Sequence, residues 1–321
     1  MTISNHNKSK AALVKDELRG ILLPITTPFH ANGELDLDGL RLNIKKWNET
    51  GILGYVLLGS TGECVHLDEA ERLSVITTAR SSAADQCRFI VGAGQQSTRG
   101  TINEIKRVSE AVTVDSFLVI TPHFYRPSIT QQALIAHYQS IADASPVPVI
   151  LYSMPALTGI KIEPETAARL SEHENIVGIK DSSADLDGLR ETIKLARKDF
   201  AVLTGNGTVL NQALSAGACG GILAVGCVAP EVCLEIFRAV TSGESERASS
   251  LQTKLTPLAQ AVTTRFGIGG LKAALEMKGY VGGTVRAPLR TPDNEAREEI
   301  RRCLDAAEGL TAKAQRSPKD S

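Results

Sequence analysis

Residues 176–182 read Ile-Val-Gly-Ile-Lys-Asp-Ser, a short apolar run that ends in polar residues. An uninterrupted apolar run of this length is typical of a strand whose two faces are both covered, as in a parallel sheet. An ammonium group on such a strand is costly unless it is paired or loses its proton. Lys180 is therefore either a lysine that reaches solvent from the strand end or a nucleophilic amine of the kind that attacks ketones.

Seven further apolar runs are similar to this one, and stretches with amphipathic helical patterns separate them. The predicted strands cover residues 21–29, 54–60, 88–94, 116–122, 147–153, 176–180, 201–205 and 220–226. Asp68 and Glu71 have the spacing of a capping box at the start of one intervening helix. Eight strands alternating with helices predict an α/β protein with a (β/α)8 TIM barrel. A doubly wound sheet is the alternative, although no GxGxxG turn follows the first strand.

The alternation of strands and helices stops near residue 242. The three helical patterns that follow cover residues 245–264, 270–279 and 293–312. We expect a flexible N-terminal arm (1–18), the barrel (19–242), a C-terminal helical appendage (243–312) and a disordered tail (313–321). The first 19 residues are polar and lack the apolar segment of a secretion signal.

The amino-acid composition argues against several classes of binding partner. Of the 321 residues, 42% are hydrophobic, which is enough for a large core, and the net charge is −1. No Lys/Arg block suggests a nucleic acid, and no apolar run approaches the ~20 residues of a membrane span. The six cysteines form no CxxC pair and have no zinc spacing. We therefore expect a cytoplasmic protein with reduced thiols, no metal site, and neither nucleic-acid nor membrane partners.

The loop after the second predicted strand reads Gly59-Ser60-Thr61-Gly62-Glu63. Active sites of TIM barrels lie at the carboxyl ends of the strands, where this loop begins. Two glycines around two hydroxyl residues favour a nest of backbone N–H groups suited to a carboxylate. The alternative is a simple capping box from Ser60 to Glu63.

Tyr152 and Lys180 end the fifth and sixth predicted strands. Side chains alternate along a strand, so Lys180 shares a face with Gly178, which would leave room for the lysine stem. Near such a lysine Tyr152 would move protons; the alternative is a core tyrosine. His123 is expected to be structural or to lie at an interface, and Asp181 to orient its loop.

Together these motifs resemble the pyruvate-dependent class I aldolases, the group of dihydrodipicolinate synthase and N-acetylneuraminate lyase. The resemblance runs from residue 18 to residue 289. Its motifs are Gly-Ser-Thr-Gly-Glu (59–63), Thr-Pro (121–122), Leu-Tyr-Ser-Met-Pro-Ala (151–156), Gly-Ile-Lys-Asp-Ser (178–182) and Gly-Gly-Ile-Leu-Ala-Val (220–225).

The resemblance implies roles for particular residues. Lys180 would form the Schiff base, Tyr152 would shuttle protons, Ser60 and Thr61 would hold the pyruvate carboxylate, and Ile222 would pack near the lysine. It also implies a small-molecule 2-oxo acid substrate and no cofactor beyond the covalent Schiff base. It further implies a homotetramer, with strand-four loop residues such as His123 and Tyr125 near a subunit contact.

Within this family the chain is most similar to 4-hydroxy-2-oxoglutarate aldolases, through residues 151–153, 175–178, 180–182, 262–268, 282–283 and 286–289. By that likeness Ser182 belongs to the site. The expected reaction is cleavage of a 4-hydroxy-2-oxo acid, here 4-hydroxy-2-oxoglutarate, to pyruvate and glyoxylate. Arg126 and Lys161 are candidate cations for the second carboxylate of this substrate.

Three alternatives stay open. The same lysine would serve a 2-keto-3-deoxy sugar acid aldolase or dehydratase. A 4-hydroxy-tetrahydrodipicolinate synthase is disfavoured because Leu157 stands where those enzymes carry an arginine. A non-catalytic keto-acid-binding protein is suggested by Phe124, which stands where most family members have a proton-passing tyrosine that Tyr125 or a water would have to replace.

Overall fold

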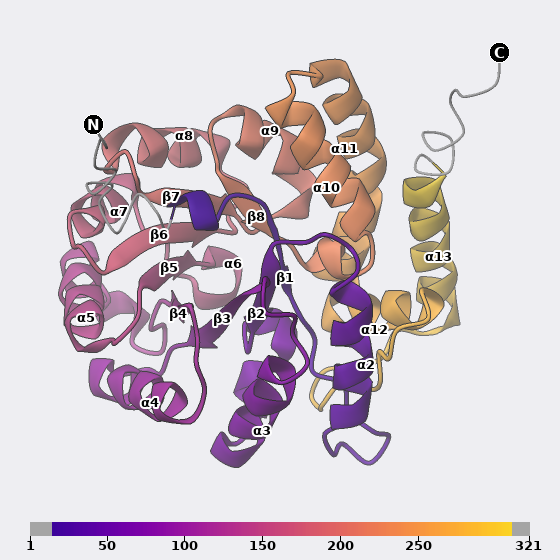
Figure 1. The fold of residues 1–321 in the computed structure, drawn as a ribbon, viewed down its shortest axis with the longest axis horizontal. Coiled ribbons are helices and arrows are strands. Elements are labelled where there is room, and N and C mark those ends of the chain that lie inside the picture. The colour runs from indigo at the N-terminus through magenta and orange to yellow at the C-terminus, as the bar shows by residue number, and fades with distance from the viewer. Residues whose placement is uncertain (1–14, 310–321) are drawn as a thin grey trace, which may run out of the picture.

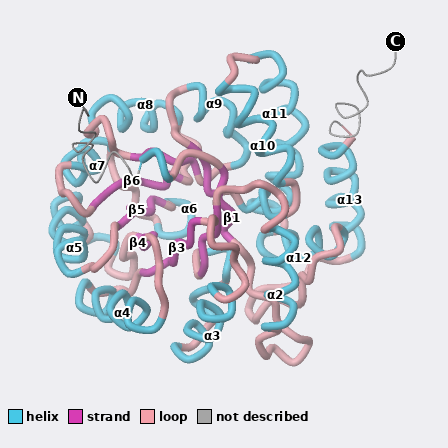
Figure 2. The backbone as a smooth tube through the Cα atoms, viewed as in Figure 1, coloured by secondary structure: helices cyan, strands magenta, loops and turns pink. Residues whose placement is uncertain are grey.

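The computed structural model describes residues 15–309. Eight parallel strands pair in chain order and close into a barrel through pairing of β1 with β8. Helices surround the strands, as Figures 1 and 2 show, so the predicted (β/α)8 barrel is confirmed. The strands are β1 (Ile21–Pro24), β2 (Gly54–Leu57), β3 (Arg88–Ala93), β4 (Ser116–Ile120), β5 (Val149–Ser153), β6 (Ile176–Asp181), β7 (Ala201–Thr204) and β8 (Gly220–Ile222).

Most strands end earlier than the apolar pattern predicted. β1 stops at Pro24 although residues 25–29 are almost entirely buried, and β8 stops at Ile222, after which residues 224–227 form a 3₁₀ turn. These segments lie under the loops of the barrel mouth, and Phe29 bridges to Leu35 and Thr284. The apolar pattern therefore identifies these residues as buried, but it does not show whether they pair in a strand.

A residue whose side chain accepts a hydrogen bond from the first helical turn precedes helices α2 (Leu37–Trp47), α3 (Glu69–Arg80), α4 (Thr98–Ala111), α5 (Gln131–Ala144) and α8 (Leu186–Leu195). The predicted capping box is present, because Asp68 accepts from the Glu71 N–H at 2.8 Å and Glu71 accepts from the Asp68 N–H at 3.0 Å. The other helices up to the last strand are α6 (Pro155–Thr158), α7 (Pro164–Ser171) and α9 (Leu210–Ser215).

The C-terminal helices lie on one flank of the barrel (Figure 1). They are α10 (Pro230–Thr241), α11 (Ser245–Gln260), α12 (Gly267–Met277) and α13 (Asn294–Glu308). A π-helical turn, Ala261–Arg265, separates α11 from α12, so the helix predicted over residues 245–264 changes type near its end. Among residues 15–309, no helix combines the length and apolar character needed to cross a membrane.

The predicted N-terminal arm and tail fall mainly outside the described residues. Residues 1–14 and 310–321 are not described, which removes the tail from view. Residues 15–17 form a helical turn, and Leu18 is buried against Leu22 inside the barrel, where its carbonyl faces Cys219. The end of the predicted arm therefore belongs to the barrel, because the Leu18 side chain is part of the apolar cluster inside it.

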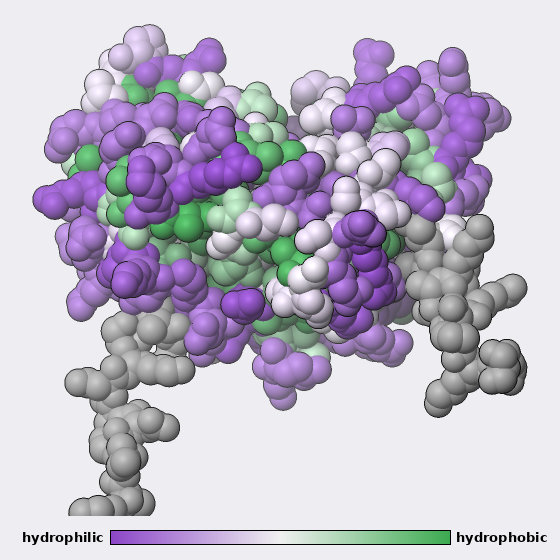
Figure 3. All heavy atoms as spheres, turned by 90° about the horizontal axis from the view of Figure 1, so that it is seen from above, coloured by the Kyte–Doolittle hydropathy of each residue, from purple (hydrophilic) through white to green (hydrophobic). Residues whose placement is uncertain are grey.

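The barrel interior is a packed core and not a pore. Leu22, Val56, Ile90, Leu118 and Ile150 fill its centre, as expected for bulky side chains projecting inward from the strands. A larger apolar cluster lies between the strands and the helices. Figure 3 shows that hydrophilic side chains dominate the outer face seen there, with hydrophobic groups confined to limited patches. Because the centre of the barrel is filled, polar groups of a binding site can gather only above this core, at an end of the barrel.

Candidate active site

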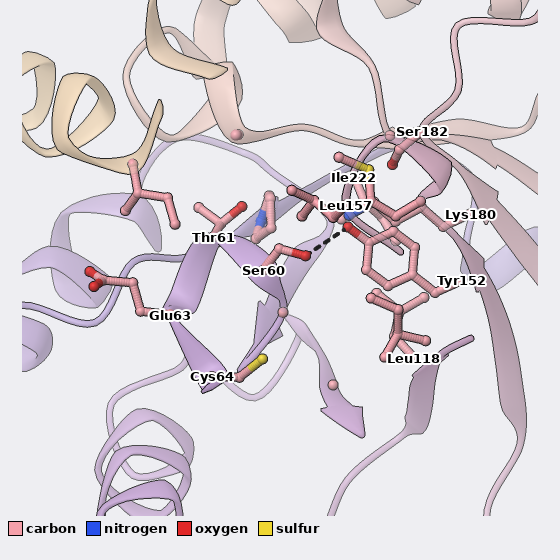
Figure 4. A pocket seen from close by; sticks show the side chains of 18 of the residues that line it. Ser60, Thr61, Glu63, Cys64, Leu118, Tyr152, Leu157, Lys180, Ser182 and Ile222 are labelled. Atoms are coloured by element: carbon pink, nitrogen blue, oxygen red, sulfur yellow. Dashed lines mark hydrogen bonds between the residues drawn. The ribbon is translucent and has the colours of Figure 1, made fainter. Parts of the chain in front are cut away.

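A pocket of about 890 Å³ lies at the carboxyl ends of the strands. All six predicted site residues line it: Ser60, Thr61, Tyr152, Lys180, Ser182 and Ile222. They come from β5, β6, β8 and the loops after β2 and β6, and Figure 4 shows several of them around one space. Closure of the barrel is what gathers them, because parallel strands place their carboxyl ends on one face.

Lys180 lies on β6, 4% exposed, between Tyr152 of β5 and Leu203 of β7 in the strand register. Among the described residues, no carboxylate lies within 4.0 Å of its ammonium group. Its Nζ is 4.3 Å from the centroid of the Tyr152 ring. Lys180 is thus a buried amine without an acid partner, the arrangement expected of a nucleophilic lysine.

The room for the lysine stem comes from a different glycine than the sequence suggested. A Cβ on Gly178 would meet the Ala201 carbonyl oxygen at 2.6 Å, so that glycine allows close approach of β7. A Cβ on Gly205 would lie 2.7 Å from Lys180 Cε and 1.9 Å from Ser182 Oγ. The prediction for Gly178 was wrong because strand periodicity says nothing about the residue after the neighbouring strand β7, which supplies the space.

Tyr152 and Ser60 meet across the pocket. Their hydroxyl groups are 3.2 Å apart, and Figure 4 shows the two side chains pointing toward one another. Tyr152 is 4% exposed and packs on the lumen cluster, so its ring is fixed while its hydroxyl remains in the pocket. At this distance a proton can pass between the Ser60 hydroxyl and the Tyr152 hydroxyl.

The turn that carries Ser60 and Thr61 is a 3₁₀ turn, Ser60–Gly62. Leu58 and Glu63, on either side, have φ values of 53° and 54°, in the left-handed region that residues other than glycine rarely adopt. The Thr27 hydroxyl donates to the Gly62 carbonyl at 2.8 Å. Ser60 makes no capping bond here, so the alternative of a capping box from Ser60 to Glu63 was wrong.

The loop after β6 has the form that the sequence predicted. Asp181 accepts a hydrogen bond from the Ser183 N–H at 2.7 Å, and its carbonyl accepts one from the Gly205 N–H at 2.6 Å. Asp181 therefore orients the loop. Ser182 and Ser183 both line the pocket, and the Asn206 side chain joins them from the loop after β7.

The loop after β4 contributes one residue to the pocket lining. His123 lines it, and both the His123 and Phe124 N–H groups donate to the Gln96 side chain, at 2.9 and 2.8 Å. Phe124 and Tyr125 are 73% and 69% exposed, contact one another edge to face, and do not line the pocket. The Tyr125 hydroxyl therefore does not replace the one missing at Phe124 within this chain.

The cations predicted for the pocket mouth are absent from it. Lys161 pairs with Asp185 at 2.9 Å and Glu163 at 3.3 Å, and neither it nor Arg126 lines the pocket. Arg72 does line it, but its guanidinium pairs with Glu104. Apart from Lys180, the described lining therefore offers no lysine or arginine without an acid partner.

Neither a cysteine nucleophile nor a metal centre is favoured in this pocket. Cys64 lines the pocket, but burial raises the pKa of its thiol, so a thiolate nucleophile is disfavoured. The described residues also contain no group of three or more His, Cys, Asp or Glu side chains that could hold a metal ion.

The sequence did not reveal the partner of Glu63. Its carboxylate pairs at 2.6 Å with Lys272 of α12, and both side chains are fully buried. The signal was a single lysine within the apolar run Gly-Ile-Gly-Gly-Leu-Lys-Ala-Ala-Leu, but nothing local identifies an acid elsewhere in the chain. Burial lowers the pKa of Lys272, and the Glu63 carboxylate opposes that effect.

Comparison with known proteins agrees with this geometry. The model of the dihydrodipicolinate synthetase family matches residues 17–307. The 4-hydroxy-tetrahydrodipicolinate synthase of Methanothrix thermoacetophila is 35% identical over 294 residues, which cover 91% of this chain and 98% of that protein.

Solved structures agree as well. The 4-hydroxy-tetrahydrodipicolinate synthase of Methylacidiphilum fumariolicum SolV has a TM-score of 0.87 at 27% identity, covering 93% of this chain and 98% of that one. A monomeric dihydrodipicolinate synthase variant has a TM-score of 0.86 at 32% identity, covering 91% and 98%. The chain therefore belongs to the dihydrodipicolinate synthetase family of pyruvate-dependent class I aldolases and is a carbon–carbon lyase.

Proposed function

We propose that Lys180 forms a Schiff base with a 4-hydroxy-2-oxo acid and that the protein cleaves this acid to pyruvate and an aldehyde. The observation that carries the proposal is a buried amine without an acid partner, 4.3 Å from the Tyr152 ring centroid, in a pocket at the barrel mouth. A lysine amine in such a pocket is a candidate nucleophile for a carbonyl group.

The proposed reaction begins when the Lys180 amine attacks the C2 carbonyl and water leaves, forming an iminium. The iminium draws electrons from the C3–C4 bond, which breaks as Tyr152 takes the C4 hydroxyl proton. An aldehyde departs, and the enamine left on Lys180 is protonated at C3. Hydrolysis then releases pyruvate and the free amine. Because the iminium supplies the electron sink, the proposal requires no metal or other cofactor.

Ser60 and Thr61 are the proposed ligands of the pyruvate carboxylate. Their 3₁₀ turn places two hydroxyl side chains at the strand end, and its backbone N–H groups would add further donors. Ser60 also lies 3.2 Å from the Tyr152 hydroxyl, which gives a short path for the proton. Ile222 is fully buried in the lumen cluster, where it would pack beneath the bound keto acid.

The proposed substrate is 4-hydroxy-2-oxoglutarate, with glyoxylate as the aldehyde. Since the pocket has no uncommitted arginine, the second carboxylate would be held by neutral donors, chiefly Ser182, Ser183 and the Asn206 amide. The same observation favours a second candidate, a 2-keto-3-deoxy sugar acid, whose distal hydroxyls suit those donors as well.

Two further candidates are weaker. Similar proteins are named 4-hydroxy-tetrahydrodipicolinate synthases, but Leu157 lines the pocket 62% exposed, and a leucine cannot bind the carboxylate of a charged aldehyde. A keto-acid-binding protein without turnover is the remaining alternative, because the loop after β4 brings no tyrosine hydroxyl into the pocket.

Borohydride reduction in the presence of pyruvate tests the shared step, and a pyruvate-release assay over 4-hydroxy-2-oxo acids tests the substrate. We expect an adduct on Lys180 and faster release from 4-hydroxy-2-oxoglutarate than from keto-deoxy sugar acids. Faster release from the sugar acids would select the second candidate. An adduct without release from any substrate would favour the binding protein, and no adduct would refute the proposal.

We also propose a homotetramer for this chain. Phe124 and Tyr125 are large exposed side chains next to the pocket residue His123, and an interface would cover them. One similar structure is of a monomeric variant, so light scattering coupled to size-exclusion chromatography is needed to measure the assembly.

A further inference from the structure

Glu63 ends the turn that carries Ser60 and Thr61, in a backbone conformation that its side chain makes unfavourable. Its φ is 54°, and the residue is 1% exposed. Figure 4 shows its side chain on the far side of the turn from Tyr152 and Lys180. Such a conformation persists only where the surroundings hold it, so the contacts of this side chain decide the shape of the turn.

Lys272 provides the strongest of these contacts. Its Nζ lies 2.6 Å from Glu63 Oε1, donates to the Thr284 carbonyl at 2.6 Å, and lies 4.4 Å from the Phe29 ring centroid. Two buried charges are tolerated only with close geometry and additional hydrogen bonds, and this pair has both. The pair links the turn to α12, a helix of the C-terminal flank.

The other carboxylate oxygen of Glu63 is also held. It accepts from the Arg286 N–H at 3.1 Å and contacts His66 Nδ1 at 3.2 Å. The Arg286 guanidinium binds Glu71 of α3 and the Gly33 carbonyl. One carboxylate therefore joins the turn to the segment before α3, to α12 and to the chain after α12.

We propose that Glu63 and Lys272 form a positioning pair that sets the Ser60–Thr61 turn for the carboxylate of the keto acid. Neither residue needs to touch the substrate; the pair acts through the backbone of the turn. The inference rests on the proposed function, because it takes that turn to be the carboxylate site. A pair with a purely structural role would change the melting temperature and leave keto-acid binding unaltered.

The test compares Glu63→Gln, Lys272→Met and the double variant with the control Lys278→Met. Lys278 directly follows the same helix, pairs with Glu308 and does not line the pocket. For each protein we would measure the melting temperature, KM and kcat, and the pyruvate concentration that gives half-maximal borohydride trapping.

In the single variants we expect half-maximal trapping to need about 10- to 100-fold more pyruvate, since a small displacement of binding groups has effects of this size. The value of kcat should change much less than KM, because Lys180 and Tyr152 are unaltered. The control should stay within about twofold of the wild type, as partly exposed ion pairs contribute little.

The double variant keeps the test decisive if a single variant fails to fold. Removing both charges leaves no unpaired buried ion, so this protein should fold and still need more pyruvate. Wild-type trapping in a folded Lys272→Met or double variant would overturn the inference, as would a fall in kcat with KM unchanged. Absence of trapping in the wild type would instead refute the proposed function on which the inference rests.

Discussion

Two lysines of this protein are buried to nearly the same degree and differ in their partners. Lys180 is 4% exposed and Lys272 is 1% exposed, and their Nζ atoms lie 4.3 and 4.4 Å from the centroids of the Tyr152 and Phe29 rings. Lys272 pairs with Glu63 at 2.6 Å, whereas Lys180 has no carboxylate within 4.0 Å among the described residues.

Burial alone therefore does not distinguish the two lysines, whereas the presence of a carboxylate partner does. A carboxylate partner stabilises the charged form, which has no electron pair for attack on a carbonyl. A buried lysine that lacks such a partner and borders a pocket is the better candidate for attack on a ketone. The four predictions below test this comparison, from the largest expected effect to the smallest.

Replacing Lys180 with Met should abolish the borohydride adduct and lower cleavage by about 10⁴-fold or more, because the covalent step is lost. The melting temperature should not fall, since an unpaired buried amine is removed. Peptide mapping of the wild-type adduct is the direct measurement. An adduct found on Lys272 would reverse the comparison.

Replacing Lys272 with Met should lower the free energy of unfolding by about 3–5 kcal/mol, because it leaves the Glu63 carboxylate buried and unpaired. Adding Glu63→Gln should recover part of this loss. Urea unfolding of the three proteins measures both effects. A loss below about 1 kcal/mol would mean that this carboxylate does not depend on the lysine.

Replacing Tyr152 with Phe should slow cleavage by about 10²-fold, the usual size of a lost general base. Trapping of pyruvate should change little, because the ring stays next to Lys180. Single-turnover cleavage and trapping, measured on the same preparation, separate the two steps. If trapping fell as far as cleavage, the hydroxyl would be needed to form the Schiff base itself.

His137 shows what burial does to a base with only a neutral partner, the Thr98 hydroxyl at 2.9 Å. Burial lowers the pKa of His137 to about 4, so the unfolded chain binds the proton more tightly. Its contribution to stability is complete above pH ~6.5 and is lost as pH falls toward 4, by about 2 kcal/mol at pH 5. His137→Gln should flatten the pH dependence of urea unfolding by that amount, and an unchanged slope would contradict the assignment.

The sequence by itself predicted the barrel and most of the residues that line the candidate site. Short apolar runs separated by amphipathic stretches reflect strands covered on both faces, and parallel strands bring their carboxyl ends together. The residues Ser60, Tyr152, Lys180 and Ser182 could be found because each follows or ends such a run. Every predicted strand exists, and only the ends differ.

Only the tertiary structure decided which groups meet across elements. The space for the Lys180 stem comes from Gly205, which follows the neighbouring strand β7. Lys161 is held by Asp185, and Glu63 pairs with Lys272, far along the chain. A local sequence pattern indicates whether a strand or helix face is buried. The residues that pack against that face come from distant segments, and only the folded chain determines which they are. The separation of a lysine paired with a carboxylate from one without such a partner is a property of the closed barrel.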